Sequence, residues 1–295
     1  MINLPAGVVE SIAVGFAAGV TARLILLRID HRQYPTLPHN TISHLAFGVI
    51  AAAVGAVALP ALMAGEFTAV TFLVLAATQF REVRSMERST LTALDSNLLA
   101  PRGADYIEGI ASVFESRNYL VMLVGLLVSS TIMLTGSIPA GSLIAVLTLV
   151  AAYRLRSGGT ISEVAAITEV PLRFDGASLY IDTIFIMNVG TDAERKEVNR
   201  YGLGLLITPQ QDTVRDKLAQ PGQRKAILHE IITALGTRQD LSVPELTPMA
   251  RKDQETGRLA FYLAPFIRDG DLAIRAGGSA PLLESSRASR KPARK

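Results

Sequence analysis

Three carboxylates stand close together in the segment that joins two apolar runs of the chain: Asp95, Asp105 and Glu108. Residues 101–103, a proline, an arginine and a glycine, break a helix between the two aspartates and could fold them together. Two aspartates that share one proton can activate water for peptide hydrolysis. The pattern therefore nominates these three residues as catalytic. A simpler interpretation stays open, in which Asp105 and Glu108 form a helix capping box and Asp95 is a solvated charge.

Other catalytic patterns are missing from the sequence. It contains neither H-E-x-x-H nor G-x-S-x-G, and it has no cysteine, which excludes disulfides, thiolate catalysis and cysteine-based metal sites. The four histidines show no metal-ligand spacing. A pair of His44 with Ser129 or Ser130 is supported by no local motif. We therefore expect no metal and no cofactor, and the residues alone do not establish a protease.

Apolar runs dominate the first half of the chain. A helix needs about 20 mainly apolar residues to cross a bilayer. Three runs are secure spans, and the third and fifth are short, so we predict a membrane α-helical bundle of about five transmembrane helices, with four or six as alternatives. The runs cover residues 6–27, 42–64, 67–80, 119–135 and 138–155.

Loop charges predict the orientation of this bundle. Arginines follow the first run at 23, 28 and 32, and five more lie between residues 81 and 117, whereas the turns at 64–66 and 136–138 carry no Lys or Arg. Under the positive-inside rule, the N-terminus is outside and the C-terminal half is cytosolic. We expect a multi-pass protein of the cell membrane.

Small residues form a stripe in the first run. Gly15 and Gly19 make a G-x-x-x-G step, which lets another helix approach closely. Packing within the chain is the simpler interpretation, and a homo-oligomer is the alternative.

The segment 81–118 is the most distinctive part of the first half. We expect the third helix to run on into water, to break at 101–103, and to be followed by an amphipathic helix along the membrane surface or beneath the bundle. Its apolar face would consist of Ile107, Ile110, Ala111 and Phe114, and Arg117, Asn118 and Tyr119 would anchor the fourth span at the headgroups.

This segment contains the hexapeptide Tyr106, Ile107, Glu108, Gly109, Ile110 and Ala111. The chain resembles the YIEGIA family of endospore-forming bacteria, which is named for that hexapeptide, over essentially its whole length. The resemblance implies a multi-pass membrane protein linked to sporulation and to regulated proteolysis restrained by a small capping partner. It brings no catalytic mechanism, so only these six positions carry over, as a signature.

The order of predicted strands and helices in the second half indicates a small α+β domain at 157–280 with a mostly antiparallel sheet. We expect a hairpin of 167–174 and 177–187 about Asp175-Gly176, a capping box at Thr191, and a buried strand at 203–207. A helix should start at Thr208-Pro209, another should stop at Gly236, and a second hairpin should turn at Asp269-Gly270.

Charge is concentrated at the end of the chain. The net charge is +3, but five cations in residues 281–295 (Arg287, Arg290, Lys291, Arg294 and Lys295) leave −2 for the rest. We expect 281–295 to be a disordered basic tail and expect no nucleic-acid partner.

Two functions follow from these features. The first is a membrane protein, with its transmembrane domain at 1–156, that regulates sporulation or cytosolic protein levels by binding a small protein at the cytosolic face. The alternative is a membrane-bound protease of cytosolic substrates that such a partner holds inactive.

Overall fold

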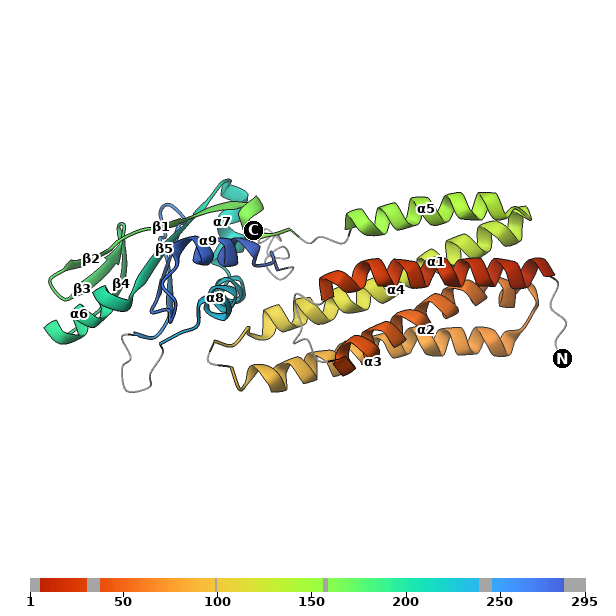
Figure 1. Cartoon of the computed structure of the whole chain (residues 1–295), viewed down its shortest axis with the longest axis horizontal. Helices are drawn as coiled ribbons and strands as arrows, with labels where there is room; N and C mark the ends of the chain where they lie inside the picture. The colour runs from red at the N-terminus through yellow and green to blue at the C-terminus, as the bar shows by residue number, and fades with distance from the viewer. Residues whose placement is uncertain (1–5, 31–37, 99, 156–158, 239–245, 284–295) are drawn as a thin grey trace, which may run out of the picture. The chain divides into compact units, whose positions relative to one another are not determined.

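The computed structural model describes residues 6–30, 38–98, 100–155, 159–238 and 246–283 (Figure 1). The chain forms two compact units that are both discontinuous in sequence. The helical unit consists of Met1–Ser89 and Ile110–Ser157, and the α+β unit consists of Thr90–Gly109 and Gly158–Lys295. Part of the segment between the third and fourth apolar runs therefore folds with the second half of the chain. The basic tail from Glu284 lies outside the described residues.

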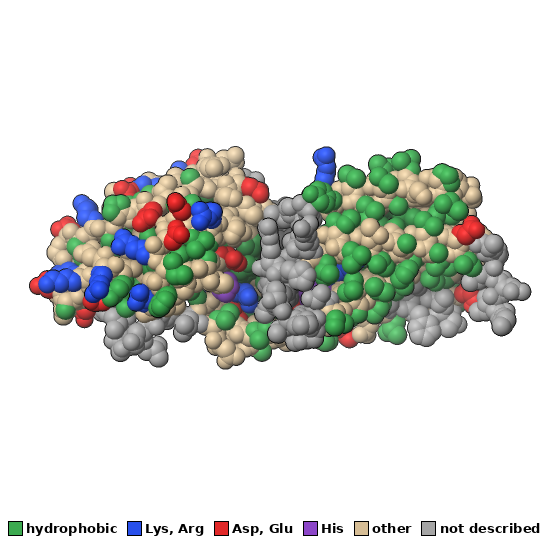
Figure 2. All heavy atoms as spheres, viewed as in Figure 1, with side chains coloured by type: hydrophobic (Ala, Val, Ile, Leu, Met, Phe, Trp, Pro, Cys, Tyr) green, Lys and Arg blue, Asp and Glu red, His purple; other side chains and the backbone are tan. Residues whose placement is uncertain are grey.

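Five helices occupy the positions of the five apolar runs: α1 (Ala6–Asp30), α2 (Pro38–Met63), α3 (Phe67–Asp95), α4 (Ala104–Thr135) and α5 (Ile138–Leu155). Among the described residues, three helices are long and apolar enough to cross a membrane, in α1, α2 and α4, and α5 has a shorter apolar stretch. Hydrophobic side chains cover the visible face of these helices, whereas charged side chains gather on the α+β unit (Figure 2). The structure thus has membrane-type helices in its first half.

Glycines let α1, α2 and α4 approach one another closely. A Cβ on Gly15 would lie 2.8 Å from the carbonyl oxygen of Gly125, and one on Gly19 would lie 2.7 Å from the Cβ of Ala52. A Cβ on Gly55 would lie only 2.0 Å from the backbone oxygen of Met122. Gly15 and Gly19 therefore pack against helices of their own chain, so these two positions give a homo-oligomer no support.

Three expectations about this half were wrong. The predicted surface helix is not separate, because α4 runs without a break from Ala104 to Thr135 and leads directly into the fourth apolar run. Arg23 does not follow the first helix but lies inside α1, where it is fully buried. Arg117 and Asn118 are also buried and are not exposed headgroup anchors.

The α+β unit contains two antiparallel sheets. One has the order β1-β5-β7-β6 and the other the order β2-β3-β4. The strands are β1 (Ala165–Glu169), β2 (Leu172–Asp175), β3 (Ser178–Ile181), β4 (Ile184–Asn188), β5 (Leu203–Pro209), β6 (Met249–Lys252) and β7 (Leu259–Leu263). The helices are η1 (Ile161–Glu163), α6 (Asp192–Tyr201), α7 (Asp212–Ala219), α8 (Pro221–Leu235) and α9 (Gly270–Ser279). The prediction of an α+β region with antiparallel pairing is confirmed.

Alternating residues of the central strands bury both faces of the larger sheet. Leu205 and Phe261 point into the core formed with α7, α8 and α9, whereas Leu206 and Tyr262 join the core formed with the smaller sheet. Side chains of a strand alternate between faces, so both β5 and β7 read as continuous apolar runs.

Some of the capping and turn predictions for the α+β unit are confirmed. The capping box of Thr191 and Glu194 opens α6, and Gly236 (φ 69°) ends α8. The first hairpin turns at Gly176 (φ 59°), one residue later than expected, since Asp175 pairs with Ser178. The expected second strand of that hairpin divides into β3 and β4 at Asp182 (φ 54°).

Two turn signals were read wrongly. Thr208-Pro209 belongs to the end of β5, and α7 begins only at Asp212. Asp269 does not turn a hairpin but is the N-cap of α9, where its side chain accepts a hydrogen bond from the backbone of Leu272 at 2.8 Å. Asp before Gly suits both a hairpin and a helix start, and the buried face of the residues that follow decides between them.

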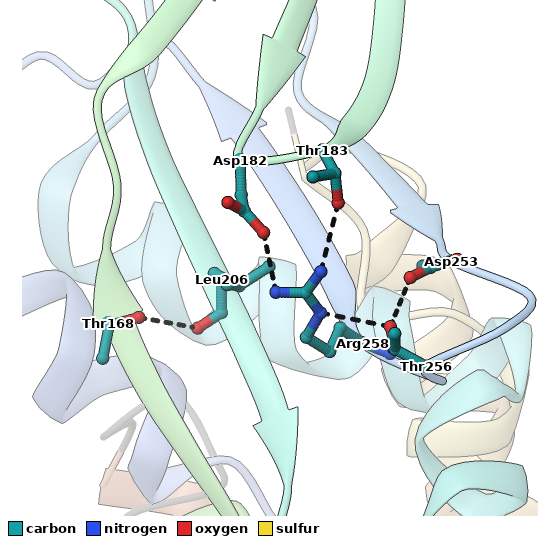
Figure 3. A network of polar contacts seen from close by, with 7 residues as sticks. All are labelled: Thr168, Asp182, Thr183, Leu206, Asp253, Thr256 and Arg258. Carbon is teal, nitrogen blue, oxygen red and sulfur yellow. Dashed lines mark hydrogen bonds and ion pairs between the residues drawn. The ribbon is translucent and has the colours of Figure 1, made fainter.

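Arg258 joins the two sheets (Figure 3). Its guanidinium donates to Asp182 at 2.6 Å and to Thr183 at 3.1 Å in the β3–β4 turn, and its Nε donates to the hydroxyl of Thr256 at 3.1 Å. The same hydroxyl donates to Asp253, and this bond holds the pKa of that exposed carboxyl below its usual value. The planar fork of Arg therefore fixes the β6–β7 connection to the β3–β4 turn.

We expect Arg258→Lys to lower the stability of the α+β unit by about 1–2 kcal/mol, because an ammonium cannot make these three bonds from one plane. The measurement is the fraction of monodisperse protein that survives heating in micelles. Lys252→Arg, a conservative change on β6, is the control, and equal heat resistance of the two variants would contradict the prediction.

Candidate functional site

Asp95, at the end of α3, holds the start of α4. Its Oδ1 accepts a hydrogen bond from the backbone N–H of Arg102 at 2.7 Å, and its Oδ2 accepts one from Gly103 at 3.1 Å. The carboxylate is buried, and Gly103 takes the left-handed conformation (φ 86°) that glycine tolerates. Asp95 thus caps the chain just ahead of α4, the role that the sequence had suggested for Asp105.

The first residues of the YIEGIA hexapeptide pack on α8 within the α+β unit. The phenol of Tyr106, which is 4% exposed, donates a short hydrogen bond to Oε1 of Glu230. His229 lies beside it with the two ring centroids 6.1 Å apart, and the Nδ1 of His229 donates to the carbonyl oxygen of Ala100 at 2.6 Å. We call these contacts of Ala100, Tyr106, His229 and Glu230 the signature latch.

Glycines of this site permit a close approach of the chain. A Cβ on Gly222, in the first turn of α8, would lie 2.0 Å from Oδ2 of Asp105 and 2.6 Å from its Cβ. A Cβ on Gly109 would lie 3.6 Å from the side chain of Leu283. Gly222 is therefore needed to admit Asp105, which sits in the first turn of α4 and remains exposed.

Burial keeps His229 neutral. Loss of solvation lowers the pKa of this imidazole below 6.5, although the hydrogen bond to Ala100 opposes the shift. The neutral ring carries its proton on Nδ1, and its Nε2 is 3.4 Å from the hydroxyl of Thr233. The docking of 100–106 on α8 therefore depends on an uncharged histidine.

This arrangement predicts a pH dependence. The unfolded chain takes up the proton of His229 near pH 6.5 and the docked chain only at lower pH, so the stabilisation is complete above pH 6.5 and is lost as the pH falls below it. We expect amide exchange at 100–109 to accelerate on acidification from pH 7.5 to 5.5, beyond the intrinsic change. His229→Gln should flatten this dependence, and an unchanged profile in that variant would assign it to another group.

The three carboxylates nominated from the sequence are placed differently from one another. Asp95 uses both oxygens on backbone amides, Asp105 lies against Gly222, and Glu108 is half-buried in the second turn of α4. Among the described residues, no hydrogen bond joins Asp95 to Asp105. Their catalytic role stays a prediction.

A buried polar cluster in the helical unit was missed by the sequence reasoning. The Nε of Arg23 donates to the carbonyl oxygen of His44 at 3.0 Å, and its guanidinium lies 5.3 Å from the ring centroid of Phe114. His44 stacks edge-on against Phe114 at 4.4 Å, with its Nε2 3.9 Å from a carboxylate oxygen of Glu87. The charge of Arg23 inside an apolar helix was the signal that could have revealed the cluster.

The paired serine of the alternative hypothesis is engaged elsewhere. The hydroxyl of Ser129 donates to the carbonyl oxygen of Ala56 at 2.7 Å. Asn118 is fully buried on α4, and its side-chain amide makes no hydrogen bond to any residue that the structure describes. Within those residues there is also no group of three or more His, Asp or Glu that could hold a metal.

These features define a class of protein: an apolar helical unit with helices able to cross a membrane, combined with an antiparallel α+β unit that incorporates the start of the fourth helix. The chain belongs to the YIEGIA family, since the family model described as "YIEGIA protein" matches residues 11–293. A relative in Bacillus subtilis (strain 168), described as "Uncharacterized protein YphB", is 42% identical over 275 residues, which cover 93% of this chain and 92% of the relative. No solved structure matches the chain. The family expected from the hexapeptide is thereby confirmed.

Proposed function

We propose that the chain is a multi-pass membrane protein that regulates sporulation or cytosolic protein levels by binding a small protein partner through its α+β unit. In this proposal about five helices span the bilayer, the N-terminus is outside and the α+β unit is cytosolic. The apolar helices and the distribution of arginines support it.

One observation carries the proposal. The signature latch makes the first part of the family hexapeptide, up to Gly109, a structural part of the α+β unit, since Tyr106 bonds to Glu230 and His229 bonds to Ala100. The same helix, α4, continues from the hexapeptide into an apolar run. Membership of the YIEGIA family supports the link to sporulation.

The absence of cysteine makes the topology directly testable. Single cysteines replace exposed residues at Ala64, in one turn proposed to face outward, and at Thr135, directly before the other, and at Ser96 and Ala193, proposed to be cytosolic. We expect a membrane-impermeant maleimide to label the first pair in intact cells and the second pair only after lysis. Labelling of Ala193→Cys from outside would reverse the orientation.

The functional test separates partner binding from the alternative, a membrane-bound protease. Asp95→Asn, Asp105→Asn and Glu108→Gln are expressed singly in a strain that lacks the protein, and turnover of the cytosolic proteome is followed. Asn and Gln keep the size and one acceptor oxygen of each carboxylate. If the chain acts by binding, Asp105→Asn and Glu108→Gln should resemble the wild type, whereas Asp95→Asn turns an amide donor toward a backbone N–H and should lower the abundance of the protein. A variant that stays abundant but matches the null strain would favour proteolysis.

The contacts of these residues favour binding over catalysis. Both oxygens of Asp95 are committed to backbone amides, and within the described residues the two aspartates share no hydrogen bond of the kind that a catalytic dyad needs.

A further inference from the structure

Arginines and aromatic rings alternate in a stack on the surface of the α+β unit. The guanidinium of Arg200 lies 5.1 Å from the ring centroid of Tyr201, and that of Arg238 lies 4.5 Å from the same centroid. Arg238 also lies 5.0 Å from the ring centroid of Phe266. We call these four residues, with Ile267 and Arg268, the arginine ladder.

The backbone of the α8–β6 and β7–α9 connections holds the ladder in place. The backbone N–H of Arg238 donates to Ala264 at 2.9 Å, and its Nε donates to Pro265 at 3.2 Å. The N–H of Ile267 donates to the carbonyl oxygen of Leu235 at 3.0 Å. The stacking of Arg238 is therefore built into the fold.

Apolar and cationic groups are presented together on this surface. Phe266 is 67% exposed and Ile267 is 55% exposed, and Arg200 and Arg268 are exposed as well. Within the described part of the chain, Arg200, Arg238 and Arg268 form no ion pair. Three cations that pair with no described acid, around an exposed apolar pair, are complementary to an acidic surface with apolar anchors.

The acids that the structure describes near the ladder make no ion pair with its arginines. Asp269 directs its carboxylate to the backbone N–H of Leu272 as the cap of α9. Asp271, in the first turn of α9, is exposed and makes no ion pair to a residue that the structure describes. Among the described residues, Glu197, one turn before Arg200 on α6, is also exposed, and neither it nor Asp271 forms an ion pair with the ladder arginines.

Nucleic acid is a poor match for the ladder. Single strands bind by stacking bases on open aromatic faces, but the rings here are already stacked with arginines of the same chain. The α+β unit, Thr90–Gly109 and Gly158–Lys295, contains 20 Lys and Arg against 20 Asp and Glu, so it lacks the overall positive field that phosphate backbones require.

An anionic bilayer would also attract arginines that lie beside apolar side chains, so anionic vesicles are one arm of the test below.

We infer that the arginine ladder is the surface on which the α+β unit binds its protein partner, and that the partner presents an acidic segment with apolar anchors. The inference rests on the proposed function and specifies the site and the chemistry of the partner. Phe266 and Ile267 supply the apolar contact, and Arg200, Arg238 and Arg268 pair with carboxylates.

A binding assay with the full chain in neutral phosphatidylcholine nanodiscs tests the ladder. The probe is a fluorescein-labelled 16-residue peptide that repeats Glu-Glu-Leu-Phe, and its counterpart repeats Lys-Lys-Leu-Phe. We expect Phe266→Ser and Arg268→Glu each to weaken binding of the acidic peptide about tenfold. Lys217→Glu, an equal charge change on α7, should alter it less than twofold. Equal affinity for the basic peptide, or no effect of the ladder variants, would overturn the inference.

Further probes distinguish the other ligand classes. Oligo-dT and vesicles with 30% phosphatidylglycerol are tested in the same way. If either binds the full chain and the ladder variants weaken that binding, while the acidic peptide does not bind, the inference of a protein partner is wrong. In cells, the double variant Phe266→Ser with Arg268→Glu should fail to complement a null strain. Full complementation would contradict the assignment of the ladder as the binding site. The proposed function fails by a different result, namely a carboxylate variant that matches the null.

Discussion

Replacing Gly55 with Ala is expected to disrupt the helical unit more than the same change at any other described glycine of that unit. The new Cβ would meet backbone atoms of α4, at 2.0 Å from the oxygen and 2.8 Å from the carbon of the Met122 carbonyl group, and a backbone cannot rotate away as a side chain can. Overpacking of this kind costs about 1–3 kcal/mol or more, because α2 and α4 must separate along their length. The fraction of folded protein after heating in micelles measures the effect.

Gly7 provides the matched control in the same unit. A Cβ at Gly7 meets no atom within 4 Å, so Gly7→Ala should leave stability unchanged or raise it by up to about 1 kcal/mol through helix propensity. If Gly55→Ala and Gly7→Ala proved equally stable, the close packing of α2 on α4 would be wrong.

The second expected result concerns the signature latch. Tyr106→Phe removes the hydroxyl that donates to Glu230 but keeps the buried ring, and should cost about 1–3 kcal/mol, since a hydrogen bond to a charged group exceeds a neutral one. Amide exchange at 100–109 should speed up accordingly, while exchange in β5 and β7 changes little.

A double-mutant cycle isolates this bond. Tyr106→Phe and Glu230→Gln are combined, and a coupling energy of about 1 kcal/mol or more is expected because the residues contact each other directly. The pair Tyr106→Phe with Lys217→Gln should be additive. A coupling near zero between Tyr106 and Glu230 would mean that the latch does not hold α4.

Periodic features were predictable from the sequence because their cause is local. The five helices of the first half follow from runs of apolar residues, and the capping box at Thr191 follows from two side chains three residues apart. The stop at Gly236 needs only the left-handed conformation that glycine accepts.

The site could not be predicted in the same way, because its contacts join residues far apart in the sequence. Tyr106 and Glu230 are separated by 124 positions, and Arg23 and His44 lie on different helices. Asp105 fitted a capping box, but Asp95 reaches the free backbone amides first from the preceding helix. The helix break at 101–103 was predicted correctly. The sequence did not reveal that Asp95 accepts the hydrogen bonds of the backbone amides that follow this break.

The discontinuity of the α+β unit has a practical consequence for producing it. A fragment cut at Gly158 would lack residues 90–109, and its α8 would lose the side chains that cover Gly222, His229 and Glu230. Such a fragment lacks part of its own fold, as one half of a split protein does. Supplying 90–109 as a separate peptide should restore it, so the hexapeptide region would act as a complementing fragment.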